Sequence, residues 1–365
     1  MTNLTMSLPA IAESRRGGDR RALARLTLSA LAVLLVAAAL LSLTSGASGA
    51  SGWSVVGSWF GLVDASDPVV ARDRLIIYDI RLPRLVLGIL VGAGLAVSGA
   101  VMQGLFRNPL ADPGLVGVSA GASLGAVGVI VLGATVLAPV AAVLGIFALP
   151  LAAFAGGLAT TLVLYRVATR RGHTAVATML LAGIAISAFA MAITGVLVYL
   201  ANDAQLRDLT FWGLGSLAGS NWTKVAAAVI PIAGGVVASM TLGGGLNAIT
   251  LGEATARHLG VPVQRLKSTA IVAVAATVGA SVAVSGGIGF VGIVVPHVLR
   301  LVMGPDNRYL LPGAALLGAA FLLVADAISR VVVAPAELPI GIVTAAVGGP
   351  FFLWILLRRR GQLWD

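Results

Sequence analysis

The chain has 365 residues, of which 58% are hydrophobic and 10% are charged, and its mean hydropathy is +1.01. Soluble domains carry roughly 25% charged residues, so this composition excludes a soluble globular protein. Because the chain contains no cysteine, disulfides, thiolate metal sites and cysteine nucleophiles are also excluded. The composition predicts a polytopic membrane protein.

Apolar stretches long enough to form membrane helices recur along the whole chain. A hydrocarbon core of about 30 Å requires about 20 mostly apolar residues in a helix. Ten stretches qualify, at 23–44, 84–106, 115–133, 137–165, 176–200, 223–242, 268–285, 290–303, 310–333 and 338–357. The eighth is short for a straight crossing, which favours half of a broken helix. Backbone at membrane depth must bond internally, so the predicted fold class is all-α with ten transmembrane helices.

The first apolar run, at 26–43, follows basic residues and precedes small ones, as the core of a signal peptide would. It is longer than the roughly 7–15 residues of such a core, so we expect a retained first span. One transmembrane domain is then predicted at 23–357, between an N-terminal tail at 1–22 and a C-terminal tail at 358–365.

Basic residues set the expected orientation, because cytoplasmic loops of membrane proteins are enriched in Lys and Arg. A cytoplasmic N-terminus places 17 of the 24 basic residues inside and seven outside, namely Arg72, Arg74, Arg81, Arg84, Arg207, Lys224 and Arg330. Both termini are therefore expected to be cytoplasmic. The net charge of +10 is also explained by basic residues that set the membrane topology. We therefore expect a lipid bilayer around the protein and no nucleic-acid partner.

Small residues recur at four-residue spacing in two of the predicted spans. The two sets are Gly88, Gly92, Ala96 and Ala100, and Gly117, Gly121 and Gly125. Such stripes let helix backbones approach closely in lipid. We expect them to form packing contacts in the core rather than ligand sites.

No motif for catalysis or nucleotide binding is complete. The string GIGFVG at 287–292 fits a dinucleotide pattern by letter, but it lacks the strand–turn–helix context, so we expect a tight turn between the seventh and eighth spans. Neither lysine belongs to a phosphate-binding loop, and His173, His258 and His297 show no metal-ligand spacing. We expect a non-catalytic chain that binds no metal and no cofactor.

Asp326 and Arg330 are the main oppositely charged residues within or near one predicted span. They lie four positions apart and are expected to pair on one helix face. An ion-coupled transporter usually needs buried carboxylates on its path, and Asp326 alone is thin support for that alternative.

A polar segment at 248–267, AITLGEATARHLGVPVQRLK, interrupts the apolar sequence. It is unsuited to crossing lipid and suited to contact with a soluble partner, and Glu253 falls where a helix dipole favours a carboxylate. The alternative is a helix lying on anionic lipid through Arg257, Arg265 and Lys267. The segment points to a transport subunit driven by another protein.

Several blocks then occur in a fixed order along the chain. They are RLPR at 81–84, GAGLAVSGAVMQGLFRNPLADPGLVGVSAGAS at 92–123, LGEATARHLGV at 251–261, GGIGFVGIVVPHVLRLVMGPDNR at 286–308, LLPGAALLGAAFLLVADAISR at 310–330 and AELPIGIVTAAVGGPFF at 336–352. Together they resemble the FecCD-type permeases, membrane subunits of ABC importers for iron-siderophores, haem and cobalamin. The resemblance covers about residues 25–358.

The resemblance implies a type II ABC importer permease fold with ten spans per subunit, in the bacterial inner membrane. It also implies a homodimer, two ABC ATPase subunits that bind ATP and magnesium, and a periplasmic substrate-binding protein. The polar segment would form two short cytoplasmic coupling helices at about 248–266 that enter a cleft on the ATPase. The residues carried over are Gly252, Glu253, Ala254, Arg257 and Gly260. Thr255 replaces an alanine of the commonest pattern, and the glycine falls one place later.

Two further sets of residues are implied by the resemblance. Arg81, Arg84 and Arg330 would dock to glutamates of the binding protein, and the alternative for them is snorkelling at the bilayer edge. The cytoplasmic gate would comprise Asn108, Leu110, Val176 and Ala177, and the cargo pathway would be lined by Met179, Gly183, Ser187 and Gly195.

The expected cargo is haem, because RNPLADPGLVGVSAGA at 107–122 resembles haem permeases more than siderophore permeases. Ferric siderophore and cobalamin are the alternatives, and an ion-coupled secondary transporter is the remote one. His297, in PHVLR, is expected to be structural.

Overall fold

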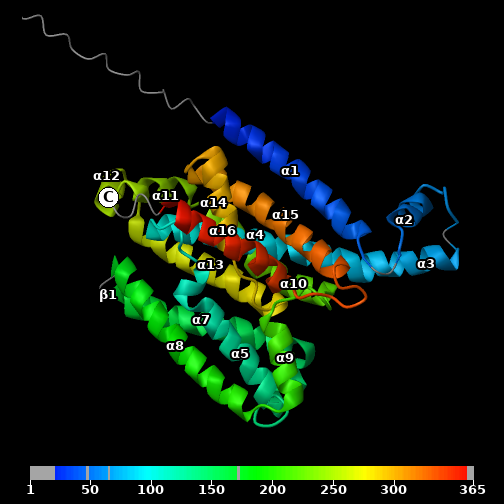
Figure 1. The fold of residues 1–365 in the computed structure, drawn as a ribbon. Helices are drawn as coiled ribbons and strands as arrows, with labels where there is room; N and C mark the ends of the chain where they lie inside the picture. Colours follow the sequence, from blue (N-terminus) through cyan, green and yellow to red (C-terminus); the bar gives the residue numbers. More distant parts are fainter. Residues whose placement is uncertain (1–20, 47–48, 65, 171–172, 360–365) are drawn as a thin grey trace, which may run out of the picture.

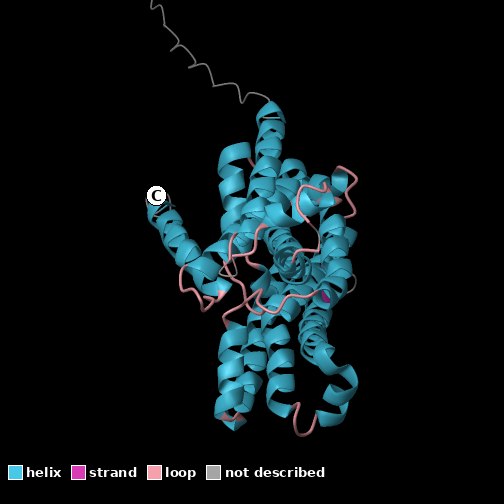
Figure 2. Ribbon diagram, turned by 90° about the vertical axis from the view of Figure 1, so that its right-hand side faces the viewer, coloured by secondary structure: helices cyan, strands magenta, loops and turns pink. Residues whose placement is uncertain are grey.

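The computed structural model describes residues 21–46, 49–64, 66–170 and 173–359. The regular secondary structure of this part of the chain is helical, apart from a hairpin of two short antiparallel strands, β1 (Thr169–Arg170) and β2 (His173–Thr174) (Figure 2). The all-α prediction is confirmed. The predicted tails at 1–22 and 358–365 fall almost entirely outside the described residues.

Each of the ten predicted spans corresponds to a helix. These helices are α1 (Arg21–Thr44), α4 (Leu82–Phe106), α5 (Val118–Leu132), α7 (Ala148–Ala168), α8 (Val176–Leu200), α10 (Trp222–Met240), α13 (Val263–Ser285), α14 (Val291–Met303), α15 (Asn307–Val331) and α16 (Ile340–Arg359). The 13 residues of α14 rise only about 20 Å, so the eighth span is short, as expected.

Shorter elements connect the long helices. They are α2 (Gly52–Trp59), α3 (Pro68–Leu75), the π-helix η1 (Ile76–Arg81), the 3₁₀ helices η2 (Pro113–Val116) and η3 (Gly145–Phe147), α6 (Ala138–Leu144), α9 (Asp203–Gly213), α11 (Gly243–Thr250) and α12 (Glu253–His258). The predicted fourth span at 137–165 matches an apolar span at Ala138–Ala168, but it is not one uninterrupted helix. Gly145 has a φ of +52°, which a continuous helix does not allow, so α6 ends there and α7 begins at Ala148.

Helix α4 lies at the centre of the bundle and packs against α10, α13, α14 and α15 (Figure 1). The expected close approach of small residues is confirmed. A Cβ added at Gly92 would lie 2.4 Å from the carbonyl oxygen of Gly318 on α15, and one at Gly125 would lie 2.0 Å from the Ala152 oxygen on α7. Only glycine permits these backbone contacts.

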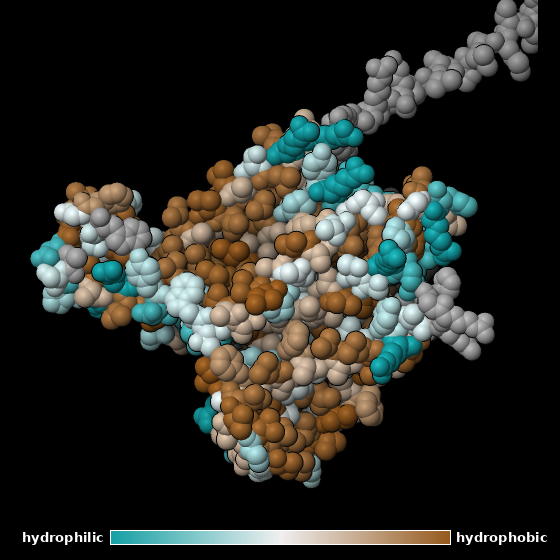
Figure 3. Space-filling model, turned by 180° about the vertical axis from the view of Figure 1, so that it is seen from behind, coloured by the Kyte–Doolittle hydropathy of each residue, from teal (hydrophilic) through white to brown (hydrophobic). Residues whose placement is uncertain are grey.

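The two ends of the bundle differ in what they carry. Helices α11 and α12 lie at one end, the α12 end, and α2 and α3 lie at the other, the α2–α3 end (Figure 1). Between them the surface is a broad hydrophobic belt, while hydrophilic residues gather toward the ends (Figure 3). Within the part of the chain that the structure describes, seven helical segments are long and apolar enough to cross a bilayer, and α5, α14 and α16 contribute shorter apolar stretches. This distribution fits a bundle that spans the membrane from end to end.

Candidate docking surfaces and gate

At the α2–α3 end, the Arg84 side chain joins α4 to two carboxylates. It donates from Nε and Nη2 to Asp326 on α15 at 2.8–3.2 Å, and from Nη1 to both carboxylate oxygens of Glu337 at 2.9 and 3.0 Å. Asp326 also pairs with Arg330 at 3.1 Å, which confirms the expected pair four residues apart. The Asp326 side chain is 1% exposed, whereas that of Glu337, in the loop after α15, is 39% exposed.

Arg81 and Arg330 reach the C-terminal turn of α1. Arg81, the last residue of η1, donates from Nη1 to the Leu43 carbonyl oxygen. Arg330 donates to the carbonyl oxygens of Ser42 and Ser45 at 3.0 and 2.9 Å. The last carbonyls of a helix lack partners within the helix and attract cations. Both guanidinium groups therefore complete the hydrogen bonding of this turn.

The structure brings the three predicted docking arginines together at one end of the bundle. Arg81, Arg84 and Arg330 are 5%, 7% and 8% exposed. Snorkelling does not describe them, because a snorkelling side chain keeps its charged head in water. Their docking to a binding protein stays a prediction. Sequence reasoning missed Glu337, whose partner Arg84 lies 253 positions away.

At the α12 end, the polar segment forms the end of the short helix α11, the whole of the short helix α12 and the first turn of α13, so the predicted coupling helices at about 248–266 extend too far at their C-terminal end. Helix α11 begins at Gly243, earlier than the predicted start at 248. Gly252, at φ +104°, turns the chain between the helices. Glu253 opens α12 and binds Lys267 on α13 at 2.7 Å and Arg257 at 3.5 Å. Because the Lys267 side chain is only 5% exposed, Glu253 anchors α12 to the core of the bundle.

The outward surface of α12 is apolar and basic. Leu251 and Leu259, which flank the helix, are 65% and 61% exposed, and the Arg257 side chain is 57% exposed. Ala254 and Gly260 are exposed as well. Exposed leucines next to a cation have the composition of a protein contact surface. Within the predicted coupling set, Glu253 positions the helix and the other residues form or border its surface.

Replacing Lys267 by methionine should uncouple α12 from the bundle. The variant removes a charge-assisted hydrogen bond of a buried side chain, worth roughly 1.5–3 kcal/mol, so we expect about a ten-fold loss in stimulation of the ATPase that the resemblance implies. The matched control is Arg265→Met, an exposed basic residue of the same segment, which should retain activity. Equal losses in the two variants would instead favour the lipid-surface alternative.

The first predicted gate pair lies in the turn that follows α4. Asn108 accepts a hydrogen bond at Oδ1 from the Leu110 N–H at 3.0 Å, which fixes an Asx turn. Asp112 ends this turn and accepts from the Gly114 N–H at 2.7 Å. Burial raises the pKa of the Asp112 carboxyl, and the Gly114 hydrogen bond opposes that rise.

The second gate pair lies at the start of α8. Ala177 is exposed, and the side chain of Val176 is outside the described residues. The preceding residue, Ala175, caps α8 and lines one cavity together with Glu253 and Lys267. The start of α8 and the anchored end of α12 therefore lie side by side, although the sequence separates them widely.

Three of the four predicted pathway residues on α8 contact protein in this conformation. Met179 is 1% exposed, and a Cβ added at Gly117 would lie 3.4 Å from Ser187 Oγ and 3.7 Å from the Gly183 oxygen. Gly195 faces open space. The exposed surface of α8 instead carries large apolar side chains, namely Leu181, Ile184, Phe189, Met191, Val196 and Tyr199. The pathway assignment stays a prediction.

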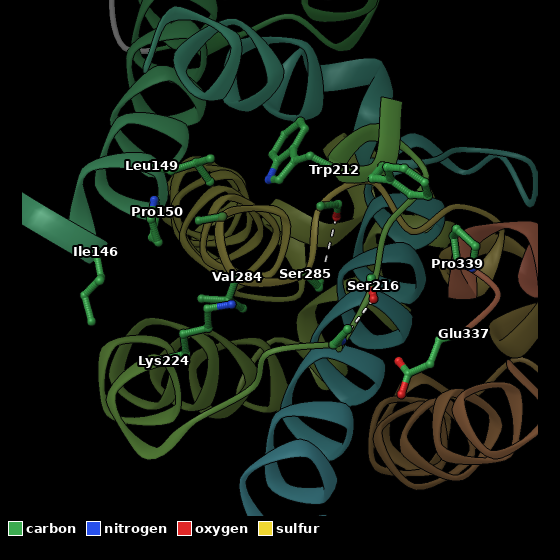
Figure 4. Close-up of a pocket in the computed structure, with 14 residues that line it drawn as sticks. Ile146, Leu149, Pro150, Trp212, Ser216, Lys224, Val284, Ser285, Glu337 and Pro339 are labelled. Atoms are coloured by element: carbon green, nitrogen blue, oxygen red, sulfur yellow. Dashed lines mark hydrogen bonds between the residues drawn. The ribbon is translucent and has the colours of Figure 1, made fainter. Parts of the chain in front are cut away.

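A cavity of about 490 Å³ opens at the α2–α3 end, where several loops meet. Its wall is mostly apolar and includes Leu149 and Trp212, and Lys224 and Glu337 are its charged residues (Figure 4). The expected tight turn after α13 forms part of the wall and is confirmed, since Gly286 has a φ of +70° and α14 starts at Val291.

Comparisons with known proteins agree with this architecture. The hemin transport system permease protein of Yersinia pestis is 47% identical over 284 residues, which are 78% of this chain and 84% of that protein. The vitamin B12 import system permease of Citrobacter koseri is 42% identical over 335 residues, covering 91% and 94%. The cobalamin permease of Halobacterium salinarum is 44% identical over 286 residues, covering 78% and 74%. A solved structure described as an inward-facing metal-chelate type ABC transporter superposes with a TM-score of 0.77 at 30% identity, covering 92% of this chain and 99% of that one.

The helical bundle and these similarities define the permease subunit of an ABC importer, a multi-pass membrane protein whose role is transport. The model of the FecCD transport family matches residues 33–358. The chain belongs to this family, as the sequence blocks predicted. Its relatives include hemin and vitamin B12 permeases, so family membership leaves the cargo open.

Proposed function

We propose that this permease moves haem from a periplasmic binding protein to the cytoplasm, powered by two separate ATPase subunits. The observation that carries the proposal is the chemistry of the two ends. One end gathers three guanidinium groups, and the carboxylate that binds Arg84 there, Glu337, is exposed enough to give way to an acidic partner; the other end presents exposed leucines and a cation on an anchored helix. Electrostatic complementarity of this kind steers docking and fixes register for a partner that must bind and leave.

In this proposal α11 and α12 are the coupling helices, and both chain termini lie on their side of the cytoplasmic membrane. Movement of α12 would pass to the start of α8, because Ala175 and Glu253 line one cavity. Val176 and Ala177 follow directly, so ATPase motion would reach the second gate pair without a long relay. Asn108 and Leu110 would form the other side of the gate.

A homodimer accounts for the unpartnered surface of α8. This helix packs against α5 and α7 on one side, while Phe189 and Tyr199 are 69% and 88% exposed. Figure 1 shows α8 at the margin of the bundle. A second copy placed there would enclose a central path between the two α8 helices. Apolar and aromatic walls suit a large, flat, mostly apolar cargo such as haem.

Asp326 argues against the ion-coupled alternative. A carboxylate that carries protons or sodium across the membrane has to gain and lose its ion during each cycle. Asp326 is held by both Arg84 and Arg330, at 2.8 and 3.1 Å, so its charge is already matched. This supports a structural role for the carboxylate and an energy source in another chain.

Competition between cargoes tests the haem assignment. The permease, its ATPase and its binding protein are reconstituted in liposomes, and uptake of haem, cobalamin and a ferric siderophore is measured at equal concentration. We expect haem uptake to exceed the other two by at least about ten-fold, the equivalent of roughly 1.4 kcal/mol of discrimination. Transport of cobalamin or siderophore with no haem uptake would end the haem assignment and leave the importer class intact.

A further inference from the structure

The Arg84 guanidinium group holds two carboxylates in very different surroundings. Asp326 occupies its Nε/Nη2 edge, is 1% exposed at the side chain and has a second partner in Arg330. Glu337 occupies Nη1, is 39% exposed, and has no other hydrogen bond or ion pair within the described residues. Removing Asp326 would leave buried charges unmatched, whereas Glu337 can exchange its partner for water at little cost.

The same corner carries more positive than negative charge. Among the described residues, Arg81, Arg84 and Arg330 meet there with the carboxylates of Asp326 and Glu337, and Asp73, which pairs with Arg72, also acts on Arg81. The groups of Arg81 and Arg330 converge on Gly46, where an added Cβ would lie 3.3 Å from one and 3.9 Å from the other. A carboxylate arriving from outside is therefore attracted to this corner. At Nη1 of Arg84 the incoming carboxylate meets Glu337, which it can displace.

Glu337 also belongs to the wall of the 490 Å³ cavity, together with Pro339 and Trp212 (Figure 4). Its loop leads into α16, whose first residue, Ile340, donates its N–H to the Gly215 oxygen in the loop after α9 at 3.0 Å. That second loop is in turn joined to the end of α13, where the Ser216 N–H donates to the Ser285 oxygen at 2.7 Å. A shift of Glu337 thus acts on a cavity wall built from three connected segments.

We propose that Glu337 is a built-in competitor for the acidic partner that docks at this end. In the free permease its carboxylate occupies Arg84 Nη1 and holds the loop at 332–339 against the cavity. A partner carboxylate takes the same Nη1 position, Glu337 is released, and the cavity wall loosens only when the partner is present. The inference rests on the proposed docking of a binding protein at the three arginines.

The test compares Glu337→Gln with the wild-type permease in nanodiscs, using the cognate periplasmic binding protein. Loss of the competing charge should tighten docking by about five-fold, the upper range expected for a half-exposed ion pair. Glu337→Asp, which keeps the charge, should stay closer to wild type. Asp208→Asn, an exposed acid on α9, is the matched control and should leave docking unchanged.

A second readout follows the cavity itself. Because the chain has no cysteine, Ser216→Cys introduces a single thiol in the cavity wall. In the wild-type background its labelling should accelerate when the binding protein docks, and in the Glu337→Gln background it should be fast without that protein. Suppose that the wild-type permease docks the binding protein and that the Glu337→Gln variant shows the same affinity and the same labelling rate. That result would overturn this inference and leave the proposed function standing. Absence of any docking by wild type would overturn the proposed function.

Discussion

Replacing Asp326 by asparagine should destabilise the permease more than any other single change of charge in the bundle. Asp326 is completely buried and neutralises both Arg84 and Arg330. The variant keeps the shape of the side chain but leaves two buried guanidinium groups facing a neutral amide. Removing one partner from a buried pair costs roughly 3–5 kcal/mol.

Thermal unfolding of the purified protein measures this effect. We expect the midpoint to fall by roughly 6–20 °C, since 1 kcal/mol corresponds to about 2–4 °C in a domain of 150–250 residues. Asp208→Asn removes the same charge from an exposed site on α9 and should leave the midpoint unchanged. A similar midpoint for Asp326→Asn and wild type would mean that the buried network does not hold α4 to α15.

The second large effect is expected where α4 crosses α14. A Cβ added at Gly99 would lie 1.9 Å from the carbonyl oxygen of Gly292 and 2.4 Å from its Cα. Gly99→Ala therefore forces two backbones apart and disturbs the Gln103 Nε2 hydrogen bond to the same oxygen, at 3.2 Å. Overpacking typically costs about 1–3 kcal/mol. Because the obstacle to the added Cβ is backbone, we expect Gly99→Ala to cost at least the upper end of this range.

Gly128→Ala on α5 is the matched control for this crossing, because the added Cβ meets nothing within 4 Å beyond its own stretch of helix backbone. Alanine exceeds glycine in helix propensity by up to about 1 kcal/mol, so the control should be neutral or stabilising. The measurement is the fraction of each variant that elutes as folded protein after extraction in mild detergent. Equal recovery of Gly99→Ala and Gly128→Ala would show that α14 can move away from α4 without loss.

The membrane fold could be predicted from the sequence because hydrophobic length alone determines where a helix can span the bilayer. Short-range features could also be predicted from the sequence, such as the pairing of Asp326 with Arg330 one helical turn away. The small-residue stripe that includes Gly92 also gave a correct expectation, since its spacing places it on one helix face. The break at Gly145 was missed, because residues on both sides are equally apolar.

The long-range side-chain contacts could not be predicted in the same way. Arg84 and Glu337 are far apart in the chain, and only the packing of α4 against α15 brings them together. Glu253 was expected to contact a partner, but its link to Lys267 depends on how α12 folds back onto α13. In both cases a conspicuous charged residue turned out to have an internal partner.

ATP-dependent uptake is the most direct test of the central claim that this permease is driven by a separate ATPase. Proteoliposomes containing the permease with its ATPase and binding protein should import haem only when ATP reaches the ATPase, and collapse of proton and sodium gradients should not reduce the rate. Proteoliposomes with the permease alone should show no uptake. Haem uptake by the permease alone that follows an ion gradient would show instead that the protein is an ion-coupled transporter.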